Sequence, residues 1–566
     1  MKIHVYALGG LGENGKNMYV VDVDEQIFIL DSGIKYPTSE LFGVDEIVPD
    51  YRMLMNKKHK IKGIFMSHAH EDHIGAISHL LKDISVPIYA TNFTMEIIKD
   101  SLKDKGYDLE IFEFNTITPY STIKFGEVKV TFFKTTHSIP ESVGIVIQTL
   151  DGSIVYTSDF TFDQSNDSNY QTDFQKINEI GERKVLLLMV ESINSTLPLD
   201  GRMNHMLDSE LNRIISHTNE RIIVSLFSSD LLKIQKVIDI ALKYDKRIAI
   251  IGRKAQRIVD IAIKMNYLTI PENKLTNLRY IDDKNQNDDP DLVCLVTGDR
   301  HEPFYMLQRM VKKHDRLIHI NENDTIIIVT SPIPGTEKMA AKTLDTLYRT
   351  DATIEVIDKS YLTINHATRD EIKMMISLLK PQYIMPVIGE YRMQYHLQSL
   401  AKEIGYDEKE VFLMNNGDVL RFTDGKPVVQ RDRYRTGDIL IDGSQAGDVN
   451  DIVIHDRELL SEDGALICIG HIDPKNKSLI GEVEVVMKGF MPEIDFEPHR
   501  DQIKIIFKEA ALNHFSNKYI NWNELKSTIR DDINKYLYKE TKQRPVTIPV
   551  LISTEQGDAV DKKALE

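Results

Sequence analysis

The sequence is poor in cysteine, has no long apolar run and carries an excess of negative charge. Its two cysteines, Cys294 and Cys468, lie far apart, each inside an apolar run, which predicts two buried free thiols. The first five residues run straight into a strand-like alternation, without a charged leader, a membrane-length apolar stretch or a small-residue cleavage site. We therefore expect a cytoplasmic protein that does not enter a membrane.

A formal net charge of −17 argues against indiscriminate binding to nucleic acid, because affinity for a polyanion depends largely on neutralising its phosphates. A local basic channel is still compatible with this charge. Three basic clusters could line such a channel, or each could be a solvated helix face. Their members are Arg253, Lys254, Arg257, Arg309, Lys312, Lys313, Arg369, Lys373 and Arg392.

Length and composition predict a soluble globular protein of several domains. At about 150 residues per domain, 566 residues suggest three or four units, and 42% apolar with 27% charged residues is typical of globular chains. Residues 1–204 show short strands broken by glycine and proline, with helices such as 71–81, which predicts a layered α/β sandwich. In residues 205–360, strands alternate with helices, which predicts a doubly wound parallel sheet. The strands expected there are 222–227, 247–252, 292–298, 325–330 and 353–357.

The strand-and-loop pattern returns in residues 361–435, so the parallel domain is predicted to be inserted into the first domain. Residues 436–450, which contain three glycines, are predicted to be a linker. A small C-terminal α/β domain is expected at 451–554, with amphipathic helices near 499–514 and 522–540 that suggest packing or assembly. Residues 555–566 have no apolar pattern and are predicted to be a tail.

A glycine-rich stretch near the N-terminus imitates a dinucleotide-binding fingerprint. Residues 10–15, GLGENG, have the spacing GxGxxG, and Asp31 follows at a plausible interval. That fingerprint requires its third glycine to open a helix whose amides face a pyrophosphate. Residues 16–23 alternate like a strand instead, so the glycines are predicted to form a hairpin turn.

The most informative stretch is HAHEDH at residues 68–73, which follows an apolar strand. His68 and His70 are two residues apart and cannot share a helix face, so they are expected on an extended loop where both reach one metal. Asp72 and His73 are expected at the start of the next helix, where they can serve a second metal. Imidazoles with a carboxylate suit zinc or manganese rather than calcium.

This motif resembles that of the metallo-β-lactamase superfamily, in which a later histidine and a later aspartate complete the metal site. His137 follows the strand-like residues 130–133, and Asp159 follows the strand-like residues 154–157, so both match that order. Asp31, after residues 27–30, resembles the superfamily's early strand-end aspartate, which supports the site by hydrogen bonds. The resemblance implies an αββα sandwich.

Further phrases resemble the ribonuclease J family, whose members carry an inserted β-CASP domain. They are GGLGENGKNM at 9–18, THSIP at 136–140, SPIPG at 331–335, and MPV at 385–387 before GEYR at 389–392. The likeness covers nearly the whole chain, including the C-terminal domain. It implies an RNA hydrolase in which two divalent metals, zinc or manganese, activate the nucleophile and stabilise charge on the phosphate.

The resemblance also implies roles for individual residues. His68, His70 and His137 would hold the first metal, Asp72 and His73 the second, and Asp159 both. Asp72, Glu191 and His366 would be catalytic, with Glu191 orienting a site histidine and His366 near the scissile phosphate. The pocket for the 5′ monophosphate or the terminal nucleotide would contain Ser331, Ile364, Asn365, His366, Ala367 and Thr368.

Four positions around the chemistry depart from the family pattern. Ile388 stands where a histidine binds the second metal, and isoleucine has no lone pair, so that metal should bind more weakly. Ser158 replaces a glycine, Glu191 an aspartate, and Asn365 a glycine. These departures resemble the second ribonuclease J paralogue of bacteria that keep two, for which the family pattern is weak activity alone and association with the more active partner.

Two hypotheses follow for the function. The first is a 5′-to-3′ exoribonuclease with reduced activity, also able to cut internally, in mRNA decay and rRNA maturation. The second is a largely non-catalytic RNA-binding or scaffolding subunit of an active ribonuclease J paralogue. Expected partners are RNA, that paralogue in a homodimer or hetero-oligomer, and an RNA-degradation complex. A small-molecule hydrolase is a third interpretation, which the large inserted domain disfavours.

Overall fold

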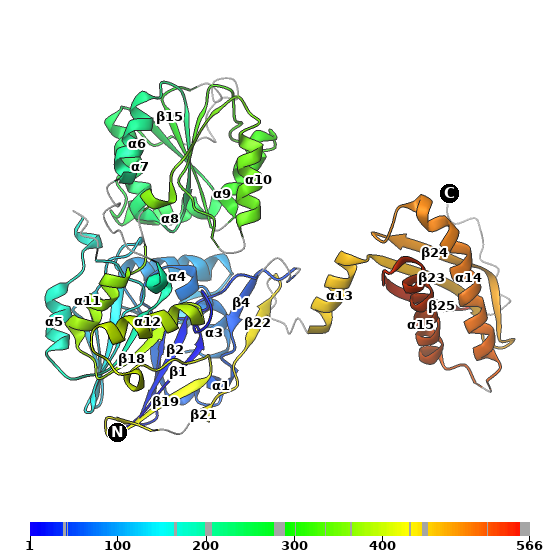
Figure 1. Ribbon diagram of the computed structural model, residues 1–566, viewed down its shortest axis with the longest axis horizontal. Coiled ribbons are helices and arrows are strands. Elements are labelled where there is room, and N and C mark those ends of the chain that lie inside the picture. Colours follow the sequence, from blue (N-terminus) through cyan, green and yellow to red (C-terminus); the bar gives the residue numbers. More distant parts are fainter. Residues whose placement is uncertain are drawn as a thin grey trace. The chain divides into compact units, whose positions relative to one another are not determined.

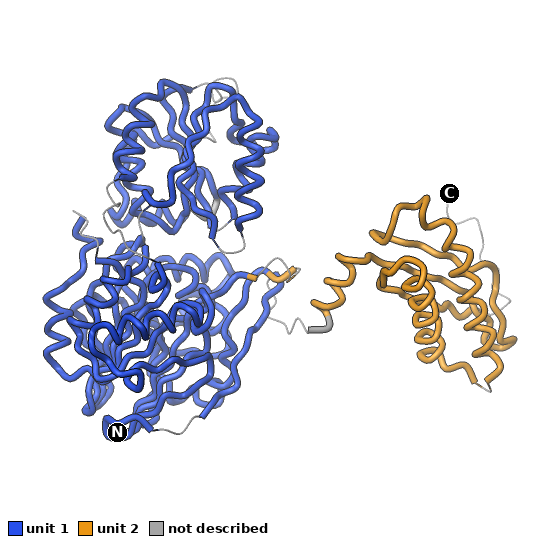
Figure 2. The backbone as a smooth tube through the Cα atoms, in the orientation of Figure 1, with its two compact units in different colours: residues 1–36, 45–446 blue, residues 37–44, 447–566 orange. Residues whose placement is uncertain are grey.

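The structure is a computed structural model that describes most of the chain. It describes residues 1–37, 41, 43–162, 167–197, 206–276, 289–299, 301–333, 336–362, 365–428, 432–443, 451–517 and 519–554. The chain divides into two compact units, shown in Figure 2: unit 1 contains residues 1–36 and 45–446, and unit 2 contains residues 37–44 and 447–566. The predicted tail lies outside the described residues.

Two sheets stack face to face in unit 1, and alternate residues of both form the apolar core between them. The first has the order β20 (Lys426–Pro427), β19 (Asp418–Thr423), β1 (Lys2–Gly9), β2 (Met18–Val23), β3 (Gln26–Leu30), β5 (Ile61–Phe65), β6 (Ile88–Ala90), β7 (Phe114–Thr116), with β21 (Asp432–Arg433) beside β19. The second has the order β18 (Tyr383–Val387), β12 (Val185–Glu191), β11 (Gly152–Tyr156), β10 (Val143–Thr149), β9 (Val128–Lys134), β8 (Thr122–Phe125).

Helices cover the outer faces of both sheets (Figure 1). On the first sheet, α3 (Ile77–Asp83) and α4 (Asn92–Asp104) share a buried cluster with β3. On the second, α5 (Phe174–Gly181), α11 (Arg369–Leu379) and α12 (Tyr391–Glu403) share a cluster with β11 and β12. The result is the predicted four-layer αββα sandwich. The antiparallel pairing of β1 with β2 also confirms that the glycines at 10–15 belong to a hairpin connection.

The inserted segment forms the predicted parallel sheet. Its order is β14 (Arg247–Ile251), β15 (Leu292–Gly298), β13 (Ile222–Phe227), β16 (Thr325–Ile328), β17 (Thr353–Val356), and every pair is parallel. Helices lie on both faces (Figure 1): α6 (Met206–His217), α7 (Leu231–Lys243), α8 (Arg253–Lys264), α9 (Glu302–Val311) and α10 (Glu337–Leu347). Cys294 in β15 and Cys468 in unit 2 are buried free thiols, as predicted.

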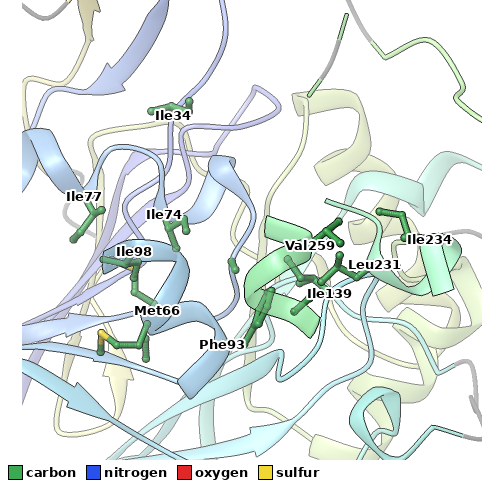
Figure 3. Close-up of a cluster of buried hydrophobic side chains, with 14 of the residues drawn as sticks. Ile34, Met66, Ile74, Ile77, Phe93, Ile98, Ile139, Leu231, Ile234 and Val259 are labelled. Carbon is green, nitrogen blue, oxygen red and sulfur yellow. The ribbon is translucent and has the colours of Figure 1, made fainter. Parts of the chain in front are cut away.

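Apolar side chains join the inserted domain to the sandwich (Figure 3). Met66, after β5, and Phe93 of α4 belong to the same buried cluster as Leu231 and Ile234 of α7 and Val259 of α8. This shared core fixes the β13–α7 turn next to the strand ends of the sandwich.

The helix predicted at 71–81 is broken in two. Helix α2 covers Glu71–Ile74, α3 begins at Ile77, and Gly75 lies between them. The backbone carbonyls of Asp72 and His73 accept hydrogen bonds from the Asn17 and Ser32 amides, at 3.0 and 2.7 Å. Because these carbonyl oxygens accept hydrogen bonds from another segment, they do not accept from amides further along the helix. The helix therefore ends, and the chain turns before α3.

The predicted linker is partly a strand. Within residues 436–450, β22 (Asp438–Ile441) pairs antiparallel with β4 (Glu46–Pro49) of unit 1. The sequence pattern missed it because a four-residue edge pair depends on a partner almost 400 residues away.

Unit 2 has its own three-stranded sheet and core. Its sheet order is β24 (Ser478–Lys488), β23 (Ala465–Asp473), β25 (Val546–Ser553), with helices α13 (Asp451–Glu462), α14 (Glu493–Phe515) and α15 (Trp522–Thr541). The two long helices lie where the sequence predicted them. In the described part of the chain, no helix has the length and apolar character needed to cross a membrane.

Candidate metal centre

Six predicted ligands gather where strands of the sandwich end. His68 and His70 follow β5, Asp72 and His73 belong to the short helix α2, His137 follows β9, and Asp159 follows β11. Ligand atoms of this set form two groups, each within 4.8 Å. The first contains His68, His70, His137 and Asp159, and the second contains Asp72, His73 and Asp159. Asp159 belongs to both, as the family resemblance implied.

The first group presents three imidazole nitrogens and one carboxylate oxygen to a single point. His70 Nδ1 lies 3.1 Å from His68 Nε2 and 3.0 Å from His137 Nε2. Asp159 Oδ2 lies 3.7 Å from His68 Nε2 and 3.6 Å from His137 Nε2. Burial lowers the pKa of all three histidines, so they are neutral, as a metal ligand must be.

The other ring nitrogen of each histidine has its own partner, which fixes the tautomer. His68 Nδ1 lies 3.0 Å from Ser67 Oγ, and His70 Nε2 lies 3.2 Å from the Ser229 carbonyl oxygen. His137 Nδ1 lies 2.6 Å from the Asn365 carbonyl oxygen. The lone pairs of the three remaining nitrogens therefore face the centre of the group.

The second group surrounds His73. Its Nε2 lies 3.5 Å from Asp72 Oδ2 and 3.4 Å from Asp159 Oδ2, and its Nδ1 lies 2.8 Å from Asp31 Oδ2. Burial lowers the pKa of His73, but the three carboxylates outweigh burial and raise it well above the ordinary value. The position therefore attracts positive charge. Asp31 supports the group by hydrogen bonds, as expected.

These residues fit two divalent metals. Histidine nitrogens and carboxylate oxygens are common ligands of zinc and manganese. Asp159 Oδ1 is buried, and no hydrogen-bond partner reaches it in the described part of the chain. Burial raises the pKa of Asp159, but His366 and His73 outweigh burial and hold it well below its usual range, so the carboxylate is ionised.

Ile388 lies directly after β18, where the family pattern has a histidine. Its side chain is 1% exposed and belongs to the apolar core between the two sheets. Its backbone has φ +53°, a left-handed conformation that a β-branched residue rarely adopts. The position offers no ligand atom, so the second group contains only Asp72, His73 and Asp159 among the predicted ligands.

The buried Glu191 and the partly exposed His366 form a pair beside the metal groups. His366 Nδ1 lies 2.9 Å from Glu191 Oε2 and 3.7 Å from Asp159 Oδ1. Glu191 Oε1 also accepts hydrogen bonds from the amides of Phe160 and Ala367, at 2.8 and 3.0 Å. Burial lowers the pKa of His366, but Asp159 and Glu191 outweigh it and raise the pKa to about 9.

The structure describes only part of the predicted substrate-binding loop. Ile364 lies outside the described residues, and Asn365 binds Asp230 Oδ2 through its side-chain amide at 3.1 Å. Thr368 is the N-cap residue of α11 and forms a capping box with Glu371, so its side chain stabilises the start of the helix. Ser331 follows β16, and no hydrogen bond joins it to the described residues of this loop.

Sequence reasoning missed several residues that support the site. Asn17, Ser67, Asp230 and the Ser229 carbonyl all contact a metal-group residue or the loop that follows residue 364. Asn17 belongs to the phrase GGLGENGKNM at 9–18, which indicated a turn and a family resemblance but no site residue. A polar residue placed directly before an apolar strand was the available signal.

Family models match four segments of the chain. They are Ribonuclease J, beta-CASP domain (residues 219–347); Ribonuclease J C-terminal domain (452–554); Beta-lactamase superfamily domain (47–224); and Zn-dependent metallo-hydrolase RNA specificity domain (365–414).

Relatives match over almost the full length. Ribonuclease J 2 of Staphylococcus aureus (strain MRSA252) is 35% identical over 549 residues, 97% of this chain and 98% of the relative. Ribonuclease J 2 of Staphylococcus saprophyticus has the same identity and coverage. A crystal structure of a protein of unknown function from Enterococcus faecalis V583 matches with TM-score 0.52 and 17% identity, over 75% of this chain and 100% of that chain, which is a likeness of fold alone. The chain belongs to the ribonuclease J family of metal-dependent ribonucleases.

Proposed function

We propose that this chain is a 5′-to-3′ exoribonuclease that also cuts RNA internally, and that it acts in the cytoplasm in mRNA decay and rRNA maturation. The observation that carries the proposal is the group of three neutral imidazoles joined through Asp159 to a second, poorer group. The large inserted parallel domain supports a polymeric substrate over a small molecule.

Each residue has an assigned task. His68, His70 and His137 would hold one metal, Asp72 and His73 would hold the other, and Asp159 would serve both. Zinc and manganese both suit these ligands. When bound, the metals stabilise charge on the phosphate and activate the attacking water.

His366 and Glu191 serve the substrate. Glu191 fixes the ring of His366 through the 2.9 Å contact at Nδ1, so Nε2 is directed away from the carboxylate. A protonated His366 offers that N–H to a phosphate oxygen of the bound RNA. The pocket for the RNA 5′ end would be formed by Ser331 with the loop 364–368.

Activity of the isolated chain is reduced, because Ile388 contributes no ligand to the second group. A metal that has fewer protein ligands binds more weakly and spends less time in the site. The first group, in which all predicted ligands and their outer partners are present, would hold its metal more tightly.

The test is degradation of end-labelled 5′-monophosphorylated RNA by the purified full-length chain with manganese. The control is Asp72→Ala/His73→Ala, prepared identically. Release of mononucleotides by the unaltered chain that is lost in the double variant would support the proposal. Equal release from both, or none from either, would contradict it.

A second candidate is a scaffolding subunit that binds RNA and an active ribonuclease J paralogue, as a homodimer or hetero-oligomer within an RNA-degradation complex. The buried Ile388 favours this second candidate, because its apolar side chain packs in the core between the two sheets and offers no atom to a metal. Removal of the residues after about 450 should then yield monomers by light scattering. Retained oligomers would count against assembly through the C-terminal unit.

A further inference from the structure

Asn17 lies between the glycine-rich loop and β2, and its backbone is held on both sides. Its amide donates to the Asp72 carbonyl oxygen at 3.0 Å, and its carbonyl accepts from the Gly33 amide at 2.9 Å. The residue is fully buried. The side chain is therefore fixed against the second metal group.

The end of the Asn17 side chain has the spacing of a metal ligand. Its Nδ2 atom lies 3.1 Å from His73 Nε2 and 3.3 Å from Asp72 Oδ2. The other candidate ligands of the group show similar separations, 3.5 Å from His73 Nε2 to Asp72 Oδ2 and 3.4 Å from His73 Nε2 to Asp159 Oδ2. Metal–ligand bonds of about 2.0–2.2 Å place neighbouring donor atoms of one ion roughly 3.0–3.5 Å apart. The Asn17 side chain therefore lies at the distance expected of a fourth ligand in this group.

We propose that Asn17 is a protein ligand of the second metal, binding through Oδ1, and that it adds one amide oxygen to the donors of Asp72, His73 and Asp159. The inference rests on the second metal position of the proposed function. It assigns to the chain a second site made of one imidazole nitrogen, two carboxylate oxygens and one amide oxygen.

A half-turn of the side-chain amide brings the oxygen into place, and Tyr19 allows that turn without losing a hydrogen bond. The Tyr19 hydroxyl lies 3.1 Å from Asn17 Oδ1 and 3.2 Å from the Gly10 carbonyl oxygen, and it accepts from the Ile388 amide at 3.1 Å. After the turn, the hydroxyl donates to Gly10 and accepts from both Asn17 Nδ2 and Ile388 N. A hydroxyl has one donor and two acceptor sites, so all three bonds are satisfied.

This ligand set has a consequence for the choice of metal. Three of its four protein donors are oxygens, from Asn17, Asp72 and Asp159, whereas a histidine at 388 would have added nitrogen. Oxygen donors suit manganese and magnesium better than nitrogen donors do. The second position should therefore favour manganese over zinc relative to the first position, which has three imidazoles.

The test measures manganese binding to the full-length chain by calorimetry, after removal of bound metal, with native mass spectrometry to count ions. Asn17→Ala should weaken the second ion by at least about tenfold and leave the first unchanged. Asn17→Asp keeps the size and an oxygen donor and should restore or tighten binding. Asn14→Ala, at an exposed position three residues earlier in the same loop, is the matched control and should bind as the unaltered chain does.

Several results would overturn the inference. One is second-site affinity in Asn17→Ala within twofold of the unaltered chain. Others are Asn17→Asp binding no better than Asn17→Ala, and an unaltered chain that binds only one ion. The proposed function can fail separately: an unaltered chain that degrades no RNA but shows Asn17-dependent binding of a second manganese would overturn the function and retain this ligand.

Discussion

Three residues beside the metal groups adopt left-handed backbone conformations that glycine normally takes. Asp31 has φ +60°, Ser158 +54° and Ile388 +53°. Each lies just after a strand of the sandwich, where the chain turns sharply toward the site. At Ser158 this explains the glycine of the family pattern, since glycine adopts such a φ freely. Backbone strain of this kind collects at functional sites, where the surrounding structure enforces it.

Ile388→His should strengthen the second metal site. Histidine adds a nitrogen donor and tolerates a left-handed φ better than a β-branched residue does. We expect the second manganese to bind roughly tenfold more tightly or better, with a faster release of mononucleotides from 5′-monophosphorylated RNA. Calorimetry and the RNA assay measure the two effects on the same preparation.

The matched control is Ile388→Leu, which also removes the branch at Cβ but adds no donor. It should leave both metal affinities and the hydrolysis rate near those of the unaltered chain. Full second-site occupancy in Ile388→His without any gain in turnover would show that the missing ligand does not limit activity.

At the scale of elements, the short helix α2 is held by the loop that connects β3 with the following chain. The Ser32 amide donates to the backbone carbonyl oxygen of His73 at 2.7 Å, and the Ile34 amide donates to the backbone carbonyl oxygen of Glu71 at 3.0 Å. Gly33 between them packs against the carbonyl of Asp72 so closely that a Cβ there would lie 1.6 Å from the oxygen. The position of Asp72 and His73 therefore depends on this glycine.

Gly33→Ala should displace α2 and weaken the second metal site. The clash involves backbone, so no side chain can move aside to relieve it. We expect a loss of at least about tenfold in affinity for the second manganese, measured by calorimetry. Gly437→Ala is the control, because an added Cβ there meets nothing within 4 Å; an equal loss in both variants would contradict the explanation.

Thr368→Ala should destabilise α11 through its N-terminal cap. Thr368 Oγ1 accepts from the Glu371 amide, and the Glu371 carboxylate accepts from the Thr368 amide at 2.8 Å. Loss of such a cap costs about 1 kcal/mol in the free energy of unfolding, measurable by urea denaturation. Thr368→Ser keeps the cap and should be close to neutral. A raised KM for RNA in both variants, with stability unchanged, would instead favour direct contact with substrate.

At the scale of the whole molecule, each of the three predicted basic clusters contains at least one cation paired with an acid. Arg257 lies 3.4 Å from Asp100, and Lys373 lies 3.1 Å from Glu403. With a net charge of −17 and these cations paired with acids, the chain is poorly suited to broad binding of phosphates, because affinity for a polyanion depends on free cations.

Metal removal should affect one unit and spare the other. Among the described residues, every group with metal-ligand spacing lies in unit 1, whereas unit 2 has a separate core. A ligand that binds only the folded state raises the melting temperature of the unit that holds it. Calorimetry of the full chain with and without a chelator should show a lowered transition for unit 1 and an unchanged one for unit 2. A truncated chain ending at residue 446 identifies the unit 1 transition, and a shift of both transitions would contradict the division.

Local patterns in the sequence predicted a layered α/β sandwich, the inserted parallel sheet and the HAHEDH motif, in which four candidate ligands occupy six residues. The family resemblance added the αββα order and the candidate ligands His137 and Asp159, which the structure brings together with the motif. The buried state of both cysteines followed from the same apolar patterns.

Only the tertiary structure decided the contacts that complete the centre. Asn17 reaches Asp72 and His73, Ser229 fixes His70, and Asn365 fixes His137, each from a segment more than 50 residues away. The break between α2 and α3 has the same origin, because distant amides bind carbonyls that a continuous helix would use. A sequence pattern records what neighbouring residues share, whereas a hydrogen bond across the fold requires two distant segments to be fixed at about 3 Å, and packing alone sets that distance.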